Sequence, residues 1–529
     1  IRCWRDYHRV KDGMNFISYN ITKSRENMRL TERKNLFLML IALPLLFCSC
    51  GSGDDSLPTK EENDNNKGEE PTIIVNPVTD LKGEETQNAN ELKVTWQNPK
   101  DPRLIRVELS YALLTERTEN EPLTQQVNAT SGSKGSFLLK LAQYGNYEIS
   151  AVAIDNYGRR SEKVTITATP SKTGFVIDWS ALADSCTYVL IEQFMNKNKG
   201  TFWKSPKDIS GGSFNIYWQQ AHAMDVVVYS YERIKDENPD LANTYKRYFK
   251  LWFENKANNY HHSASDETGF LNPFTDDMCW ICLTMIHLSE ATGDNTYINM
   301  AKKIYDQHII TRAWTDNKGT GLPWQTESNG RNACTNSPGC LIAVKLYKKF
   351  NKENYLTDAK TLYKYIESNL LKDDGRVEEP PLTYTQGTFG EACRQLYHVT
   401  QEASYMRMAE KVINYTATSS RCLRNGILRD EGTSMDQSIF KAVFVPYAIN
   451  LILDDKALSS IRTSLRSFMK ENAKTLRNNL NRKKYPAMYC DYYWGSMFSG
   501  DVASMGAQTS GASLMEGIAR MLASENNPE

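Results

Sequence analysis

The hydrophobic pattern of this chain changes its period near Pro170, and this change constrains the fold more than any other feature. Before Pro170, apolar residues alternate with polar ones, as in the run Leu92–Trp96. After it, apolar residues recur with the spacing of an α-helix up to the end of the chain. The pattern therefore predicts an all-β part over residues 71–170, followed by a longer all-α part over residues 171–525.

The β part consists of short alternating runs separated by turn residues such as Asn98-Pro99 and Tyr157-Gly158. Roughly 100 residues of this pattern predict an antiparallel β-sandwich. The strand that contains Trp96 and the stretch Ala153–Ser161 resemble a fibronectin type III module. No cluster of polar residues in this part indicates catalysis, so we expect it to act as a spacer or docking module.

The helical part predicts twelve helices whose connections alternate in length. Short turns such as Thr292–Asp294 follow every second helix, and long segments rich in Gly, Asn, Thr and aromatic residues precede each of those helices. Six helical hairpins joined in this way are what a closed (α/α)6 toroid requires, whereas a superhelical repeat array would show repeats of fixed length. The expected helices cover residues 178–195, 217–234, 240–256, 275–292, 296–310, 332–349, 353–371, 386–400, 403–418, 434–454, 457–476 and 505–522.

The same alternation predicts where function lies. The even-numbered helices would form the inner ring, with their N-termini at the face that carries the long loops. Helix N-termini hold partial positive charge and unpaired N–H groups, which favour ionised carboxylates. The long loops supply the walls of a cleft. We therefore expect functional residues just before and at the starts of the even-numbered helices.

The N-terminal segment carries a targeting signal. A basic stretch that begins at Met28 is followed by the apolar run Leu36–Phe47, which is too short to span a bilayer. The run leads into Ser49-Cys50-Gly51, which resembles a bacterial lipoprotein cleavage site with Cys50 as the lipidated residue. We interpret the N-terminal segment as sequence upstream of the true start, a lipoprotein signal peptide and a disordered tether, over residues 1–27, 28–50 and 51–70.

This interpretation predicts an outer-membrane lipoprotein that contacts the membrane through its lipid anchor only. Asp54 and Asp55 follow the lipidated cysteine and resemble the surface-export signals of Bacteroidetes lipoproteins, which favours the cell surface. A periplasm-facing location and an ordinary signal peptide are the alternatives.

Charge and cysteine content exclude several classes of function. Lys+Arg and Asp+Glu are both 63, so the chain has no basic footprint for nucleic acid and no excess of positive charge for an acidic polymer. Cys279 and Cys282 lie within a helical pattern, and no second pair follows at zinc spacing. We therefore expect no metal, no cofactor, no nucleic-acid partner and a monomeric chain.

The residues with the clearest chemical use are Asp276 and Asp277, which stand together at the start of the fourth predicted helix. Their simplest interpretation is N-capping by Thr275 or Asp276. A glycosidase, however, needs two carboxylates about 5–5.5 Å apart to retain configuration, or roughly 6.5–9.5 Å apart to invert it. Neighbours at a helix start can flank a glycosidic bond, and the one with more N–H donors stays charged while the other holds its proton.

Five segments of the helical part resemble glycoside hydrolase family 76, the α-1,6-mannanases, and they occur in the order found in that family. The first to stand out is Asp-Asp-x-x-Trp, at Asp276–Trp280. The resemblance extends over about residues 172–525. The other four segments are Trp218–Asp225, Gly321–Trp324 with Arg331–Asn336, Tyr384–Gly387, and Asp436–Phe444.

The resemblance implies a retaining endo-α-1,6-mannanase that acts on the α-1,6-mannan backbone of yeast or fungal mannan. Asp276 would be the nucleophile that forms a covalent mannosyl-enzyme, and Asp277 the general acid/base, so the leaving group needs no metal. Arg331, Thr385 and Ala442 stand where the family has Lys, Asn and Gly. These departures concern subsite contacts rather than the Asp pair.

Further residues are predicted to line the substrate cleft because they lie near inner-helix starts or in the long loops. The aromatic side chains would stack on mannose, and the polar ones would bind hydroxyl groups; core packing, loop packing or capping is the alternative for each. His222 lies in an apolar helix and is interpreted as structural. The predicted cleft residues are Trp218, Trp324, Asn332, Asn336, Tyr384, Gln386, Asp436, Trp494 and Gln508.

Two alternative functions stay open on the sequence alone. One is another glycosidase on the same toroid, such as a different α-mannosidase or an unsaturated-uronide hydrolase, although the long loops show no basic cluster for a uronide carboxylate. The other is a non-catalytic surface glycan-binding lipoprotein, which would need the aromatic residues but not the acid pair.

Overall fold

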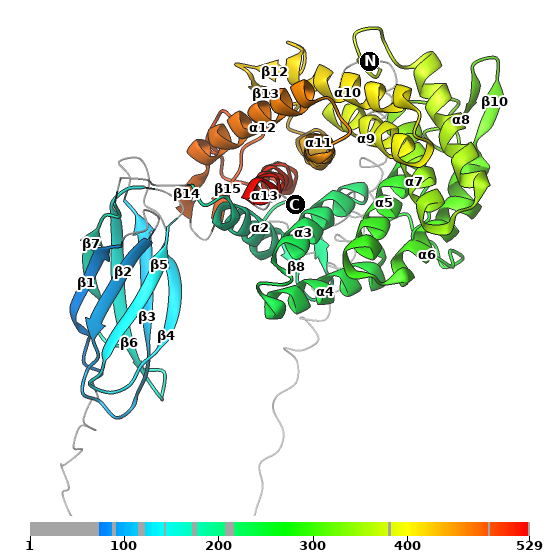
Figure 1. Cartoon of the computed structure of the whole chain (residues 1–529). Coiled ribbons are helices and arrows are strands. Elements are labelled where there is room, and N and C mark those ends of the chain that lie inside the picture. Colours follow the sequence, from blue (N-terminus) through cyan, green and yellow to red (C-terminus); the bar gives the residue numbers. More distant parts are fainter. Residues whose placement is uncertain are drawn as a thin grey trace, which may run out of the picture. The chain divides into compact units, whose positions relative to one another are not determined.

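Figure 1 shows the fold as a computed structural model. The predicted signal peptide, Cys50 and the tether lie outside the described residues. Among the described helices, none is both long and apolar enough to cross a membrane. The structure describes residues 74–86, 91–114, 122–141, 144–171, 177–206, 216–378, 382–484 and 487–526.

The β part is built of antiparallel strands whose side chains alternate between buried and exposed positions, as the period of two predicts. One sheet has the strand order β1-β2-β5, and the other has the order β4-β3-β6-β7. The strands are β1 (Thr79–Glu85), β2 (Glu91–Gln97), β3 (Leu104–Leu113), β4 (Leu123–Asn128), β5 (Lys134–Lys140), β6 (Tyr147–Asp155) and β7 (Val164–Ala168).

The two sheets share one hydrophobic core, in which Val94 of β2 packs with Leu109 of β3 and Ile149 of β6. Trp96 pairs across β2 and β5 with Gly135, and a side chain at that glycine would lie 2.1 Å from the indole. The prediction of an all-β part is therefore confirmed. Its likeness to a fibronectin type III module stays a prediction.

The part of the chain described after residue 177 contains twelve long α-helices, close to the spans expected from the sequence. They are α2 (Trp179–Phe194), α3 (Trp218–Ile234), α4 (Pro239–Glu254), α5 (Thr275–Thr292), α6 (Asn295–Ile304), α7 (Ala333–Phe350), α8 (Glu353–Asn369), α9 (Thr383–Thr400), α10 (Ala403–Thr418), α11 (Met435–Leu453), α12 (Ser459–Asn479) and α13 (Met505–Asn526).

Short strands and helical turns lie in the connections between these helices. The strands are β8 (Met195–Asn196), β9 (Thr201–Phe202), β10 (Trp314–Asp316), β11 (Gly319–Gly321), β12 (Leu423–Arg424), β13 (Ile427–Leu428), β14 (Asn481–Lys484) and β15 (Ala487–Tyr489). The helical turns are η1 (Lys256–Asn258), η2 (Tyr305–Ile309) and η3 (Ile310–Arg312).

The helices form two rings, which Figure 1 shows from one end. In the inner ring α3, α5, α7, α9, α11 and α13 pack each against the next, and α13 packs against α3 to close the ring. The remaining helices lie outside them. This is the (α/α)6 toroid that the alternating connection lengths predict.

Burial follows ring position. Helix α5 belongs to the inner ring, and every residue from Thr275 to Ser289 is buried. Helix α4 belongs to the outer ring and buries one stripe, which includes Tyr245, Phe249 and Trp252 at helical spacing. An inner helix is covered by neighbours on all sides, so its polar residues are buried as well and need partners.

Helix α9 begins at Thr383 rather than near Gln386, where the sequence pattern predicts it. The Glu431 carboxylate accepts hydrogen bonds from the Thr383 amide at 2.7 Å and from its hydroxyl at 2.5 Å. Burial raises the pKa of Glu431 to about 7. A residue from the distant α11 connection therefore caps this helix, and the local pattern cannot reveal such a partner.

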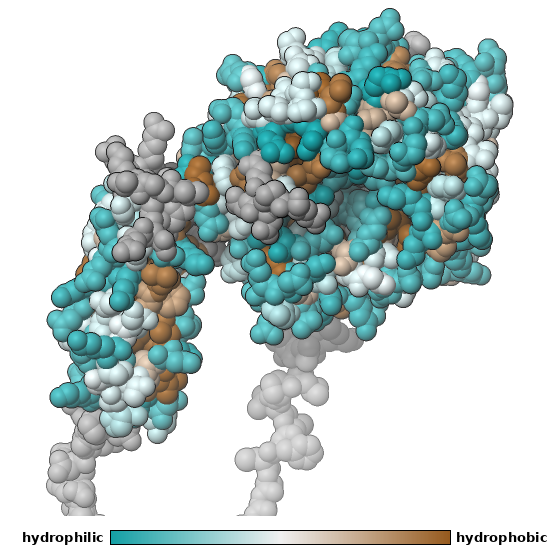
Figure 2. Space-filling model, in the orientation of Figure 1, coloured by the Kyte–Doolittle hydropathy of each residue, from teal (hydrophilic) through white to brown (hydrophobic). Residues whose placement is uncertain are grey.

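A pocket of about 670 Å³ lies toward the C-terminal ends of the inner helices and is lined by residues from all six. Its cations include Arg233, Lys345 and Arg394, and cations are favoured at helix C-termini because they offset the negative end of the helix dipole. Figure 2 shows that the surface of the helical part is mostly hydrophilic, with a hollow near the middle of this view.

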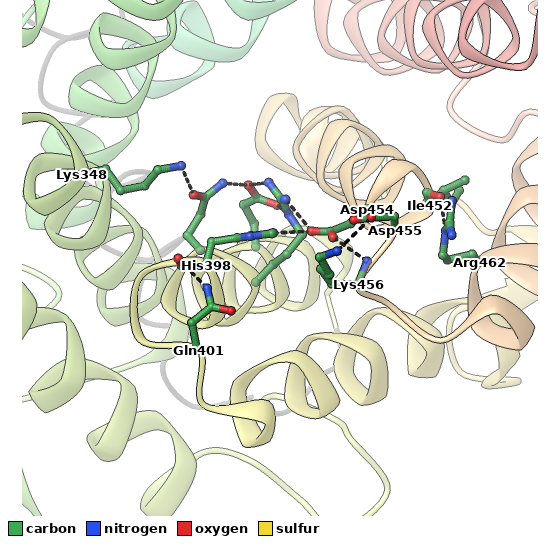
Figure 3. Close-up of polar contacts among 11 residues, drawn as sticks. Lys348, His398, Gln401, Ile452, Asp454, Asp455, Lys456 and Arg462 are labelled. Atoms are coloured by element: carbon green, nitrogen blue, oxygen red, sulfur yellow. Dashed lines mark hydrogen bonds and ion pairs between the residues drawn. The ribbon is translucent and has the colours of Figure 1, made fainter. Parts of the chain in front are cut away.

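Figure 3 shows the charged network that continues outward from this pocket. The Arg394 guanidinium donates to both carboxylate oxygens of Glu391, at 2.9 and 2.7 Å, and to Asp454 Oδ2 at 2.9 Å. Gln395 also donates to Glu391 and accepts a bond from Lys348. The Glu391 carboxylate is fully buried, so these donors replace the water that it would otherwise bind.

We predict that Arg394→Ala lowers the free energy of unfolding by about 3–5 kcal/mol, because it leaves the buried Glu391 carboxylate without its main counter-charge. Urea unfolding followed by circular dichroism measures this loss. The matched control is Lys456→Ala, which removes an exposed pair with Asp455 and is expected to change stability by less than about 0.5 kcal/mol. Equal losses in the two variants would contradict the prediction.

Candidate active site

Asp276 and Asp277 lie in the first turn of inner helix α5, and their exposed fractions are 8% and 1%. The simple capping interpretation is wrong for this helix, because Phe274 occupies the N-cap position and has no side chain that can cap. Instead the Thr275 amide donates to the Trp324 carbonyl at 2.8 Å. The start of α5 is thus held by the long loop that precedes α7.

Asp276 is held by two N–H donors. The Asp277 amide donates to Asp276 Oδ1 at 3.0 Å, and the Trp324 indole donates to Asp276 Oδ2 at 3.2 Å. The Trp324 ring packs against Phe274, with 5.2 Å between the centroids. Hydrogen bonds from N–H groups stabilise the ionised form of a carboxyl, and the position at a helix N-terminus acts in the same direction.

The charges of the pair also act on neighbouring side chains. Burial raises the pKa of Tyr384, and the negative charge of Asp276 adds to this rise. Burial raises the pKa of Tyr217 as well, with a contribution from Asp277. Tyr384 lies in the first turn of α9 and Tyr217 directly precedes α3, so the pair lies near residues from two other inner-helix starts.

An aromatic cluster lies one helical turn beyond Asp276. Trp280 of α5 lies 6.3 Å from Trp218 and 6.0 Å from Tyr384, measured between ring centroids. Phe440 of α11 stacks on Tyr384 at 4.2 Å and on Trp218 at 6.0 Å. The structure therefore brings together Trp218 and Tyr384, which the sequence analysis predicted as cleft residues. It adds Trp280 and Phe440, which the sequence analysis did not predict as cleft residues. The spacing of Trp280, four residues after Asp276, was the available signal.

Asp436 joins this cluster from the first turn of α11. It accepts a hydrogen bond from the Trp218 indole at 3.0 Å and a further one from the Gln219 side chain. The turn itself is set by a capping box between Ser434 and Gln437. Asp436 therefore orients Trp218 beside the candidate site, and its contact with substrate stays a prediction.

Beneath the cluster, three buried polar residues connect α3 and α5. His222 packs edge-on against Trp218 and Trp280. Asp225 lies 3.7 Å from His222 Nδ1 and 3.1 Å from His287 Nδ1. Burial alone would raise the pKa of Asp225, but the two histidines outweigh it and lower that pKa to about 2. The ionised Asp225 thus fixes both histidine rings below the site.

Four predicted cleft residues are instead fully buried and belong to loop packing. The Asn336 side chain accepts a hydrogen bond from the Leu322 amide at 2.8 Å and donates one to the Leu322 carbonyl at 3.0 Å. Trp494 is fully buried, and Lys441 Nζ lies over its ring, 4.2 Å from the ring centroid. The prediction that these four residues line the cleft is wrong, because their side chains make hydrogen bonds or ring contacts with other parts of the protein. The four residues are Asn336, Gln386, Gln508 and Trp494.

The side-chain amides of Gln386 and Gln508 also make hydrogen bonds to backbone groups of other segments. Gln386 accepts from the Val377 amide at 2.5 Å and donates to the Gly375 carbonyl at 3.2 Å. Gln508 accepts from the Cys490 amide and donates to the Cys186 carbonyl, both at 3.1 Å. Each side chain replaces the backbone partners that an irregular loop lacks.

Asn332 stands at the N-cap of α7 and is half-buried, with its Oδ1 accepting a bond from the Thr335 hydroxyl. The preceding Arg331 is stacked between Trp314 and Tyr365 and pairs with Asp316 at 2.5 Å. Arg331 is one of the three residues that depart from the family pattern, and these contacts give it a structural role in the loop.

The described residues include no group of three or more His, Cys, Asp or Glu side chains placed to hold a metal ion. Cys279 and Cys282, the spaced pair of the sequence, are buried free thiols, and burial raises the pKa of both.

The profile of glycosyl hydrolase family 76 matches residues 178–527, which is the whole helical part. The chain belongs to glycosyl hydrolase family 76. Together with the closed inner ring, this assigns the helical part to the (α/α)6 glycoside hydrolases of that family.

Solved structures of family 76 members share this fold. The α-1,6-mannanase GH76A of Salegentibacter sp. HEL1_6 is 26% identical, covers 65% of this chain and 99% of its own, and has a TM-score of 0.57. That structure is an inactive variant, with two consecutive aspartates replaced by alanine, in complex with α-1,6-mannotetrose. No curated protein sequence matches the chain.

A second solved structure extends over more of the chain. It is a family 76 glycoside hydrolase from a bovine Bacteroides thetaiotaomicron strain, with 18% identity and a TM-score of 0.54. The match covers 85% of this chain and 100% of that one. Because the helices lie within Trp179–Asn526, a match of this extent reaches into the β part.

We predict that Trp324→Phe lowers kcat, because the ring can still pack on Phe274 but no longer donates to Asp276. A hydrogen bond to a charged group contributes about 1.5 kcal/mol or more, which corresponds to about a tenfold loss. The matched control is Trp314→Phe, in the same long connection, which stacks on Arg331 and is expected to keep kcat. Steady-state hydrolysis of a family 76 substrate measures both; an unchanged kcat for Trp324→Phe would contradict the prediction.

Proposed function

We propose that the protein is a retaining endo-α-1,6-mannanase that cleaves the α-1,6-linked backbone of mannan. The observation that carries the proposal is the pair of buried carboxyl groups at the start of α5, one of which is held by two N–H donors. Membership of family 76 and the mannotetrose complex of the Salegentibacter enzyme support the choice of substrate.

In the proposed reaction Asp276 is the nucleophile, because its two N–H donors favour the ionised carboxylate and fix its direction. Its oxygen attacks the anomeric carbon and forms a mannosyl-enzyme ester, while Asp277 gives its proton to the departing glycosidic oxygen. In the second step Asp277 takes a proton from water, the water oxygen attacks the anomeric carbon, and the ester bond to Asp276 breaks. The two inversions retain the anomeric configuration.

The aromatic cluster suits a neutral sugar. Mannose has no charge, and its apolar C–H faces pack on aromatic rings. Tyr384 is half-buried and is the member of the cluster with the most exposed surface, so it is our candidate for stacking on substrate. Trp218 and Trp280 are buried and are expected to support Tyr384 and shape the floor of the site.

For the N-terminal segment we propose lipidation at Cys50 and attachment to the outer membrane, facing the cell surface. The support is the sequence alone: a short apolar run, a small residue before Cys50 and acidic residues after it. The β part would then act as a spacer or docking module between the anchor and the hydrolase.

The decisive experiment is digestion of debranched α-1,6-mannan followed by sizing of the products. We expect a ladder of oligosaccharides from the wild type and no release from Asp276→Asn or Asp277→Asn, while both variants still bind α-1,6-mannotetrose. Release of mannose alone would replace the endo assignment by an exo one. Binding without any cleavage by the wild type would support the non-catalytic alternative.

The matched control is Asp240→Asn, which removes an aspartate from the first turn of an outer helix. It shares the helix-start position with Asp276 and Asp277 but lies outside the inner ring, so wild-type hydrolysis is expected. Wild-type rates in either inner-ring variant would refute the assignment of the pair.

A further inference from the structure

We propose that Arg312 is a positioning residue for the Asp276–Asp277 pair. This inference rests on the proposed hydrolase function and concerns how the pair is held. Arg312 ends the helical turn η3, in the long connection between α6 and α7. Its guanidinium reaches back to the segment that leads into α5.

Three hydrogen bonds connect Arg312 to this segment. Nη1 donates to the Pro273 carbonyl at 3.2 Å and to the Thr275 hydroxyl at 3.1 Å. Nη2 donates to the Asn272 carbonyl at 3.1 Å. The guanidinium is a rigid planar fork, so bonds to three groups define the position of this backbone much more narrowly than a flexible ammonium could.

The same segment is held from its other side by the loop that carries Trp324. The Thr326 amide donates to the Pro273 carbonyl at 3.1 Å, so this carbonyl is shared with Arg312. The Thr275 amide donates to the Trp324 carbonyl. The segment from Asn272 to Thr275 is thus held by both η3 and the Trp324 loop, and any displacement of it would move both carboxyl groups.

The charge of Arg312 indicates a functional rather than a merely stabilising role. A cation near a helix N-terminus is unfavourable with respect to the helix dipole. Burial also opposes it and lowers the pKa of Arg312. Within the described residues no ion pair between Arg312 and a carboxylate is found, since its bonds go to backbone carbonyls and a hydroxyl. A half-buried cation in this place is favourable if the adjoining helix start must carry an ionised carboxylate.

The test compares Arg312→Ala and Arg312→Lys with the wild type. Because a displacement of about 1 Å at reacting groups can cost about 100-fold in rate, we expect kcat of Arg312→Ala to fall by about that factor. Arg312→Lys keeps the charge but not the fork, so it is expected to recover only part of the loss. Affinity for α-1,6-mannotetrose, measured by calorimetry in an Asp277→Asn background, is expected to stay within about twofold, since Arg312 bonds protein rather than substrate.

The matched control is Arg462→Ala. Arg462 is also half-buried and donates to a backbone carbonyl, that of Ile452, at 2.9 Å (Figure 3). Ile452 lies in the last turn of α11, so this bond is at the end of the toroid opposite the start of α5. It is expected to keep the wild-type kcat. A wild-type kcat in Arg312→Ala, or a parallel loss of kcat and affinity, would overturn the positioning role.

Two further outcomes separate this inference from the proposed function. If Arg312→Ala fails to fold, as judged by circular dichroism, the Arg312→Lys variant tests the positioning role. A wild-type kcat in Arg312→Lys would overturn that role, and a reduced kcat with unchanged affinity would support it. If the wild-type protein releases no product from mannan, the hydrolase assignment fails, and the positioning of the pair fails with it as a catalytic role.

Discussion

The hydrogen bond from the Thr275 amide to the Trp324 carbonyl determines where helix α5 begins, and the candidate site depends on it. A helix start without a capping side chain leaves its first amide N–H groups to find other acceptors. Here a distant loop supplies the carbonyl, and the same loop supplies the indole that binds Asp276. One connection therefore both starts the helix and orients the proposed nucleophile.

The two ends of the toroid differ in charge. Asp276, Asp277 and Asp436 lie in the first turns of inner helices, where the helix dipoles favour them, whereas the pocket toward the C-terminal ends combines arginine and lysine residues with four glutamates. Buried charges at both ends are held by networks, such as that around Glu391 and that around Asp225. Arg312 is a cation close to the acidic start of α5 that bonds to backbone carbonyls and a hydroxyl group, and this placement is what makes it informative.

Prediction from the sequence succeeded where local pattern decides the outcome. The bounds of α5 agree with expectation because its apolar residues and the turn at Gly293 mark them. It failed where a distant partner decides. Asn336 and Gln386 stand near inner-helix starts, as cleft residues would, but each is used to satisfy a loop backbone. The same residue types occur at such positions whether the side chain binds a ligand or a loop backbone, so the sequence alone does not distinguish the two roles.

The sequence by itself determined the order of a β part and a helical part, the alternation of inner and outer helices, and the place of Asp276 and Asp277 at an inner-helix start. These follow from hydrophobic period and connection length, which are local properties. Only the tertiary structure decided which side chains surround the pair. Phe440 and Arg312 come close to it through ring closure and loop contacts between residues far apart in the chain, and no local pattern encodes such contacts.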